Sequence, residues 1–228
     1  MNRFFQTGLL MALCVLLTDC NGQTRRPADT ASPGDRIGGD FENREFMYYG
    51  IPDAIDATDT SAGWPQPGQK ILLKGTVYAA DGKTPVPGVL LYYYQTNTEG
   101  RYLHRPEEPR SMPPNERRQT NGYIRGWVRT DSTGRYFIYT VRPGSYPGSR
   151  EPAHVHVSVK EPNVLNEYYI DEFLFDDDPF LTADRRKKLE NRGGNGVLRL
   201  IANGDLQVGE RNIVLGRNIP NYPARRRD

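Results

Sequence analysis

The fold is decided by residues 70–95, KILLKGTVYAADGKTPVPGVLLYYYQ, which hold two apolar segments joined by a polar turn. Residues 70–79 (KILLKGTVYA) are rich in aliphatic and β-branched side chains, which favour an extended strand. Asp81-Gly82 follows directly, and this dipeptide is typical of a tight turn. Residues 89–95 (VLLYYYQ) are apolar without alternation, as in a strand that is buried on both faces. We therefore expect a β-rich core built on these two strands.

Strand patterns continue along the rest of the chain at short intervals. The 14 tyrosines, 23 glycines and 18 prolines suit short strands joined by turns rather than long helices. The expected strands are residues 123–130, 135–141, 153–160 and 167–175, with residues 196–202 and 211–215 as a closing pair. We expect residues 131–134 (DSTG) to close a hairpin and one short helix to lie within residues 176–191. This spacing predicts an all-β fold, an antiparallel β-sandwich with long loops and at most one or two short helices.

The first 20 residues have the pattern of an export signal. Arg3 gives a positive start, and residues 9–17 (LLMALCVLL) form an apolar segment that is too short to span a bilayer. Residues 17–20 (LTDC) resemble a lipobox, where a lipoprotein signal peptide is cut and the cysteine is lipidated, although Asp19 replaces the usual small residue. The alternative is an ordinary signal peptide with an incidental cysteine. We expect an exported, periplasmic or outer-membrane lipoprotein that is anchored through Cys20.

This signal divides the chain into four expected parts. They are a lipoprotein-type signal peptide (1–19), a lipid-anchored tether with an N-terminal arm (20–66), the β-sandwich (67–218) and a tail (219–228). The start of the tether is rich in Pro, Gly, Ser and Thr, as flexible linkers are, whereas the aromatic residues 46–49 suggest an arm packed on the domain. A net charge of only +2 excludes the basic field that nucleic-acid binding needs. Cleavage would leave a single cysteine, so we expect neither an intrachain disulfide nor a cysteine metal site.

Two of the three histidines form the segment His154-Val155-His156. Alternate side chains of a strand share one face, with Cα atoms roughly 6.5–7 Å apart, so both imidazoles can reach one metal ion. Such a pair is also common at half-buried structural positions, and imidazole alone does not choose among iron, zinc and copper. The turn before it, residues 142–147 (RPGSYP), is rigid and would hold Tyr146 near the start of the same strand.

Five short motifs follow one another along the chain. They are Tyr94-Gln95-Thr96-Asn97, Gly100-Arg101-Tyr102, residues 131–136 (DSTGRY), Pro143-Gly144-Ser145-Tyr146-Pro147 and Pro152-Ala153-His154-Val155-His156. In this order they resemble the intradiol ring-cleavage dioxygenases, the family of catechol and protocatechuate dioxygenases. Residues 212–215 (NIVL) are also similar to the family's closing strand. The resemblance covers roughly residues 68–218.

The resemblance implies an iron site made of Tyr102, Tyr146, His154 and His156. Anionic, hard phenolate oxygens favour Fe(3+), and a bound cation makes phenolate available although a free phenol has a pKa near 10. In the family the ferric ion binds a catecholate while one tyrosine, here Tyr146, leaves the metal, and the electron-rich ring then meets O₂. Both oxygen atoms enter the product, a muconate-type dicarboxylate opened between the two hydroxylated carbons. The implied cofactor is Fe(3+), and the implied substrates are a small catechol-type aromatic and O₂.

Two positions depart from the family pattern. The family carries arginine directly before Pro-Ala-His, where this chain has Glu151, with Arg150 one residue earlier; a one-residue bulge would return Arg150 to the site. The family's Thr-Gln on the next strand is replaced by Asp171-Glu172. Besides Tyr146, we assign catalytic roles to Arg150 and Glu172. Because both changes add negative charge, they favour a neutral or cationic catechol over one that carries a carboxylate.

Two alternatives to a dioxygenase remain open. A β-sandwich of a surface lipoprotein can serve as a binding module, which would need neither a metal nor the tyrosines. The same pocket can also hold zinc or copper at His154 and His156. In each case we expect no nucleic acid and no membrane contact beyond the lipid anchor, and a homo-oligomer is compatible with the sequence.

Overall fold

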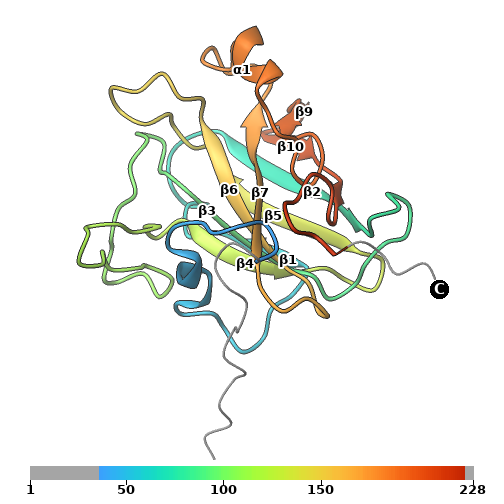
Figure 1. Cartoon of the computed structure of the whole chain (residues 1–228). Coiled ribbons are helices and arrows are strands. Elements are labelled where there is room, and N and C mark those ends of the chain that lie inside the picture. Colours follow the sequence, from blue (N-terminus) through green and yellow to red (C-terminus); the bar gives the residue numbers. More distant parts are fainter. Residues whose placement is uncertain (1–35, 224–228) are drawn as a thin grey trace, which may run out of the picture. The chain divides into compact units, whose positions relative to one another are not determined.

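The computed structural model describes residues 36–223, which form a sandwich of two β-sheets (Figure 1). One sheet has the strand order β1–β5–β2–β10–β9, with β11 also paired to β2, and the other has the order β4–β3–β6–β7–β8. The strands are β1 Thr58–Thr60, β2 Lys70–Tyr78, β3 Leu90–Gln95, β4 Arg125–Arg129, β5 Arg135–Val141, β6 His154–Lys160, β7 Tyr168–Phe175, β8 Val197–Leu198, β9 Ile201–Asn203, β10 Leu206–Glu210 and β11 Ile213–Val214. The expected signal peptide, Cys20 and most of the tether lie outside the described residues.

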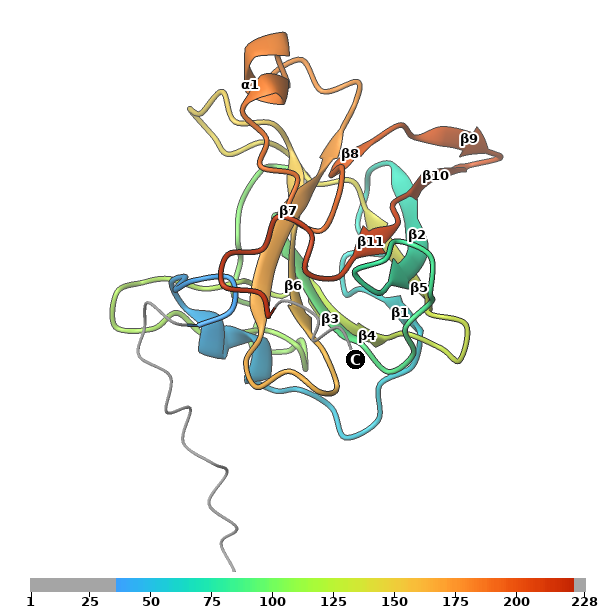
Figure 2. The same cartoon turned by 45° about the vertical axis from the view of Figure 1, so that its right-hand side comes forward.

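The two sheets pack face to face, and this packing fixes which side chains point outward (Figure 2). On β6 the alternate residues Val155, Val157 and Val159 are fully buried in the core between the sheets. Because side chains of a strand alternate, the residues between these valines, His156 among them, face the other side of the sheet. The site therefore lies on the outer face of the second sheet, where β3 presents Tyr92 and Tyr94 beside it.

The N-terminal arm covers part of this outer face. A 3-10 helix, η2 (Arg44–Tyr48), buries Phe46 and Met47 against it. The indole of Trp127 donates to the Met47 carbonyl at 2.7 Å, and Arg125 donates to the Phe46 carbonyl at 3.0 Å. With the arm on one side and the core on the other, β3 is buried on both faces, as its unbroken apolar sequence predicted.

The all-β sandwich expected from the sequence is confirmed, but its sheets are mixed rather than purely antiparallel. The pairs β1–β5, β10–β2, β11–β2 and β7–β8 run parallel. The expected hairpin across residues 131–134 is wrong, because β4 pairs with β3 in one sheet whereas β5 pairs with β2 in the other. Asp131 accepts hydrogen bonds from the backbone of Thr133 and Arg135, so the turn itself forms as predicted, and it carries the chain from one layer to the other.

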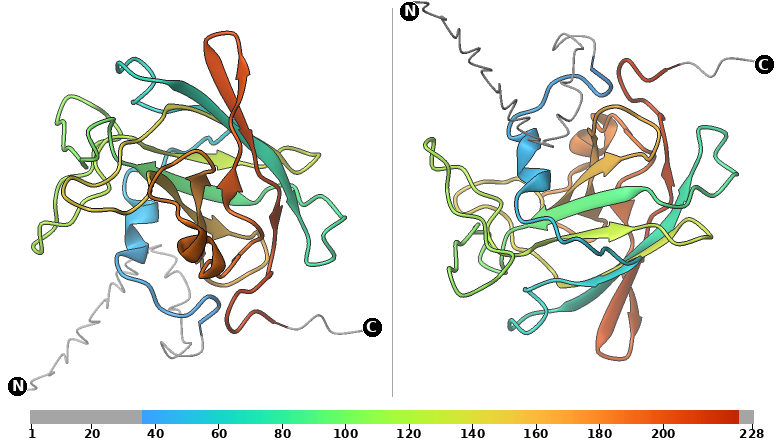
Figure 3. Two further views of the ribbon diagram at one scale, coloured as in Figure 1. Left: turned by 90° about the horizontal axis from the view of Figure 1, so that it is seen from above. Right: turned by 90° about the horizontal axis from the view of Figure 1, so that it is seen from below.

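The C-terminal elements also differ from expectation. The closing pair of residues 196–202 and 211–215 does not form: β8 extends the second sheet beside β7, and β11 joins β2 in the first. Between them β9 and β10 form a hairpin at the edge of the first sheet (Figure 3). The helix expected within residues 176–191 is present as one short helix, α1 (Ala183–Lys187), with Thr182 as its N-cap. Among residues 36–223, no helix combines the length and the apolar character needed to cross a membrane.

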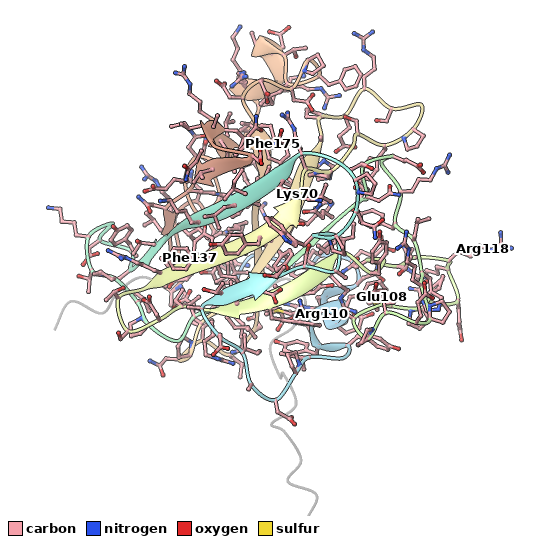
Figure 4. The ribbon with its side chains drawn as sticks, turned by 180° about the vertical axis from the view of Figure 1, so that it is seen from behind. Lys70, Glu108, Arg110, Arg118, Phe137 and Phe175 are labelled. Carbon is pink, nitrogen blue, oxygen red and sulfur yellow. The ribbon has the colours of Figure 1, made fainter. Side chains whose placement is uncertain are left out.

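A long loop joins β3 to β4 and carries Tyr102. Figure 4 shows Glu108, Arg110 and Arg118 on this loop, to one side of the sandwich. The Arg110 guanidinium donates to the Asp59 carboxylate on β1 at 2.7 Å, and the buried Tyr93 hydroxyl donates to the same carboxylate at 2.6 Å. These bonds tie the loop to the scaffold on which the site is built.

Candidate metal centre

The two histidines stand at the start of β6, on its outer face. Pro152 and Ala153 lead into the strand, and the Ala153 amide donates to the Asp178 carboxylate at 2.9 Å, which fixes where β6 begins. His156 lies opposite Tyr94 of β3, and the two rings stack with centroids 4.4 Å apart. The imidazole of His154 meets that of His156 edge to face at 4.5 Å. The prediction that alternate histidines share one face is confirmed.

Two loops bring the tyrosines to these histidines, and glycine makes their contact possible. The Gly144 amide donates to the Asn97 carbonyl at 2.9 Å, so the loop before β6 lies directly against the loop after β3. A Cβ atom on Gly100 would lie 1.8 Å from the Ser145 carbonyl oxygen, and one on Gly144 would lie 2.4 Å from the Thr98 carbonyl oxygen. Only residues without a side chain allow the two backbones to approach this closely.

Four side-chain atoms meet at the centre of the site. The Tyr146 hydroxyl lies 3.1 Å from Nε2 of His154 and 3.3 Å from Nε2 of His156. The two Nε2 atoms are 3.0 Å apart, and the hydroxyls of Tyr102 and Tyr146 are also 3.0 Å apart. The structure thus brings together the four residues that the resemblance implied as iron ligands.

The hydrogen bonds around this cluster leave the two histidine Nε2 atoms without a proton. Nδ1 of His154 lies 2.7 Å from the Pro152 carbonyl oxygen, which only accepts, so its Nε2 carries a lone pair. Nδ1 of His156 lies 3.0 Å from the Tyr169 hydroxyl, which donates to a carboxylate, so Nε2 of His156 carries a lone pair as well. Two lone pairs that face each other repel, and the single proton of Tyr146 serves only one of them. A cation bound by all four atoms removes this conflict, and the donor set therefore fits a metal ion.

Burial sets the protonation of these groups in the absence of a cation. It raises the pKa of the phenols of Tyr102 and Tyr146, and the pKa of Tyr102 is raised further by its neighbour Tyr146. Burial lowers the pKa of His156 below its ordinary value, so the ring is neutral at pH 7 and its Nε2 is free to bind a metal. A metal ion would reverse the effect on the phenols, because its charge favours the phenolate form.

A second group of residues orients His156. Its Nδ1 donates to the Tyr169 hydroxyl, and Tyr169 in turn donates to the carboxylate of Glu172. Burial opposes the charge of Glu172, but the nearby His156 imidazole, whose Nδ1 lies 3.6 Å from the carboxylate, and the hydrogen bond from Tyr169 outweigh it and lower the pKa of the carboxyl to about 2. Hydrogen bonds of this kind fix the orientation of a metal-binding imidazole. The sequence did not single out Tyr169, because its place near His156 depends on the pairing of β7 with β6, in which Tyr169 lies opposite Ser158.

The remaining predicted residues lie in different surroundings. Arg150 is exposed in the loop before β6. Glu151 and Glu172 line a cavity beside His154, which places both carboxylates next to the cluster. Asp171 faces away from the cluster, and its carboxylate accepts hydrogen bonds from the amides of Asn191 and Arg192. Of the two acidic departures on β7, only Glu172 therefore contributes charge at the site.

The fold and the cluster together define a β-sandwich with a tyrosine–histidine cluster, suited to a metal ion, on the outer face of one sheet. Residues 45–203 match the family described as Dioxygenase, and the chain belongs to the intradiol ring-cleavage dioxygenases. It is 30% identical over 127 residues to a protocatechuate 3,4-dioxygenase beta chain of Burkholderia cepacia, covering 51% of this chain and 49% of that one. It is 28% identical over 127 residues to a catechol 1,2-dioxygenase of Acinetobacter baylyi, covering 48% and 38%. The chain thus spans half or less of the length of these relatives.

Solved structures share the fold. The dioxygenase domain of a dioxygenase–carbohydrate-binding fusion from Streptomyces sp. SirexAA-E superposes with a TM-score of 0.50 at 24% identity, over 72% of this chain and 90% of that one. The 3-chlorocatechol 1,2-dioxygenase of Rhodococcus opacus 1CP gives a TM-score of 0.52 at 20% identity, over 72% and 67%. At these identities the likeness concerns the arrangement of the strands.

Proposed function

We propose that this protein is a non-haem Fe(3+) dioxygenase that opens a catechol-type ring between its two hydroxylated carbons with O₂, giving a muconate-type dicarboxylate. The observation that carries the proposal is the convergence of two phenol oxygens and two imidazole nitrogens: the Tyr146 oxygen lies 3.0–3.3 Å from the other three atoms, and the two nitrogens are 3.0 Å apart. Imidazole alone suits zinc and copper as well, but two hard, anionic phenolates favour the ferric ion. Tyr102, Tyr146, His154 and His156 would hold it.

Bound there, a ferric ion supplies the Lewis acidity that turns a catechol into an electron-rich partner for O₂. The protein's own part is to orient the ring and to move its protons. The Tyr146 hydroxyl is the centre of the cluster, in contact with Tyr102 and with both histidines, and its loop is partly exposed. The Tyr146 oxygen is therefore placed to take a proton from an incoming catechol hydroxyl.

Glu172 acts in this proposal by positioning. Its carboxylate accepts the Tyr169 proton, and this holds the Nδ1 proton of His156 in place, so that Nε2 stays directed at the cluster. Arg150 is exposed at the rim, and the role that the resemblance implies for it, to balance negative charge on the substrate, stays a prediction.

The test is a visible spectrum of the purified protein after ferric reconstitution, together with elemental analysis and an assay for a muconate-type product from catechol. We expect a phenolate-to-iron absorption band that shifts on adding catechol, followed by product formation. His154→Gln should abolish all three signals, whereas His104→Gln is the matched control, because His104 pairs with Ser111 outside the cluster. A protein that stays colourless and free of iron is not this dioxygenase, and zinc or copper in the elemental analysis would favour the other metals.

We also propose export and lipid anchoring through Cys20, on the apolar segment and lipobox-like residues of the N-terminus. Mass spectrometry of the mature N-terminus checks this. A lipid-modified Cys20 that disappears in Cys20→Ala is the expected result, and an unmodified N-terminus at another residue would contradict it.

A further inference from the structure

A cavity of about 230 Å³ adjoins the metal centre. His154 and Glu172 line the end at the cluster, and α1 with the segment after it supplies Arg185, Lys188 and Leu189. Figure 1 shows α1 beyond the ends of β6 and β7, apart from the sheet that carries the histidines. Sites for drug-sized ligands occupy roughly 300–1,000 Å³, so this cavity suits a single ring with a short side chain.

The sequence suggested a negatively charged pocket, but the residues that line the cavity include cations as well as carboxylates. Glu172 already accepts the hydrogen bond of Tyr169, which leaves Glu151 as the other carboxylate of the cavity. Two cations, Arg185 and Lys188, also line the cavity, and they are three residues apart and thus on one side of α1 and its C-cap. Counting Glu151 and Asp171-Glu172 alone favoured a neutral or cationic catechol, and that count left out α1.

The neighbours of these two cations on the helix are paired, whereas they themselves are not. Arg186 lies 2.7 Å from the Asp176 carboxylate and Lys187 lies 3.4 Å from that of Asp184. Within residues 36–223, neither Arg185 nor Lys188 comes within ion-pair distance of a carboxylate. Two unpaired cations at the rim of a cavity are suited to an anionic group of a ligand.

The wall between the cluster and the cations is apolar. Leu174 of β7, Leu181 before α1 and Leu189 after it line the cavity together with Pro152. His154 is the member of the cluster that lines this cavity, so a ligand whose hydroxyls bind at the cluster would extend past His154 and lay its side chain along these leucines, where burial of apolar surface is favourable. An anionic group must therefore sit at the end of an apolar stem to reach α1.

We infer that this cavity selects catechols whose side chain has a short apolar stem that ends in a carboxylate, with Arg185 and Lys188 binding the carboxylate. The inference rests on the proposed function for the ring itself, since the hydroxyls are assigned to the metal centre. Glu151 discriminates against a second negative charge near the ring, so the stem also separates the substrate's carboxylate from that of Glu151.

The test compares three ring substrates with the iron-loaded full chain: catechol, dihydroxyphenylpropionate, and dihydroxyphenylethylamine, which has a similar stem and the opposite charge. We expect the acid to have the highest kcat/KM, and Arg185→Gln/Lys188→Gln to lower that value about tenfold while catechol is unaffected. Added salt should weaken the acid selectively. Lys187→Gln is the matched control, because Lys187 is on the same helix but is paired with Asp184 and does not line the cavity.

Calorimetric binding of hydroxyphenylpropionate, which has one hydroxyl and is not a catechol, separates this inference from the proposed function. Tight binding that the double substitution weakens supports the acid site even if no ring is cleaved. Cleavage of catechol with no preference for the acid, or an equal loss for acid and amine in the double variant, overturns the inference and leaves the dioxygenase intact. Failure of hydroxyphenylpropionate to bind, together with failure of all three substrates to react, overturns both.

Discussion

Replacing Gly100 with alanine tests whether the metal centre depends on the contact between its two tyrosine loops. Gly100 has a φ of 76°, and its Cβ position lies 1.8 Å from the carbonyl oxygen of Ser145. Ordinary van der Waals contact begins at 3.4 Å, so an alanine would push the backbones apart by about 1.6 Å. Both atoms belong to the backbone, and a rotamer change cannot relieve the collision.

The expected magnitude follows from two separate costs. A left-handed conformation costs a residue with a side chain roughly 1–2 kcal/mol. Overpacking adds typically 1–3 kcal/mol, so Gly100→Ala should lower the free energy of unfolding by about 2–5 kcal/mol. At about 2–4 °C per kcal/mol for a domain of this size, the melting temperature should fall by about 10 °C. A displacement of more than 1 Å at the hydroxyls should reduce activity about a hundredfold.

The assay is thermal unfolding followed by ferric titration at the phenolate absorption band. Gly82→Ala is the matched control, since Gly82 has a φ of 69° but nothing within 4 Å of its Cβ position. It should show the conformational cost alone, about 1–2 kcal/mol, with normal iron uptake. If Gly100→Ala unfolds at the same temperature as Gly82→Ala and takes up iron with the same colour, the loop contact does not position the tyrosines.

Three further substitutions probe the site and its scaffold. Tyr169→Phe removes the hydroxyl that orients the second histidine and should weaken iron binding about 10–100-fold, as judged by competition with a chelator, whereas Tyr139→Phe in the other sheet should not. Tyr146→Phe removes one phenolate, so the visible band of the ferric protein should lose intensity and move; an unchanged spectrum would exclude this tyrosine as a ligand. Asp59→Ala breaks the hydrogen bonds from Tyr93 and Arg110 that hold the loop between β3 and β4. It should lower the free energy of unfolding in denaturant by about 1.5–3 kcal/mol per charged bond and speed proteolysis within that loop. Equal cleavage rates in the variant and the unaltered protein would show that other contacts hold the loop.

The four residues of the cluster could be predicted from the sequence because their information is local. His154 and His156 share a face through the two-residue period of a strand, and each tyrosine follows a glycine in a short motif. The supporting residues could not be predicted in this way. Tyr169 contacts His156 from the neighbouring strand β7, and Tyr94 stacks on it from a strand about 60 residues away.

The sequence by itself determined the long strands β2 to β7 and the face of β6 that carries the histidines, because apolar content and alternation act within a few residues. The short strands β1 and β10 were not expected from it. Tertiary structure decided which strands pair. The local hydrogen bonds of the turn at residues 131–134 are the same whether or not its flanking strands pair with each other. Because β4 and β5 are buried in different sheets, the turn connects the two layers and does not close a hairpin. Tertiary structure also decided the charge of the cavity, since Arg185 and Lys188 reach it from a helix that follows β7. Electrostatic interactions depend on distance in space and not on separation along the chain, so a count of neighbouring residues in the sequence missed both cations.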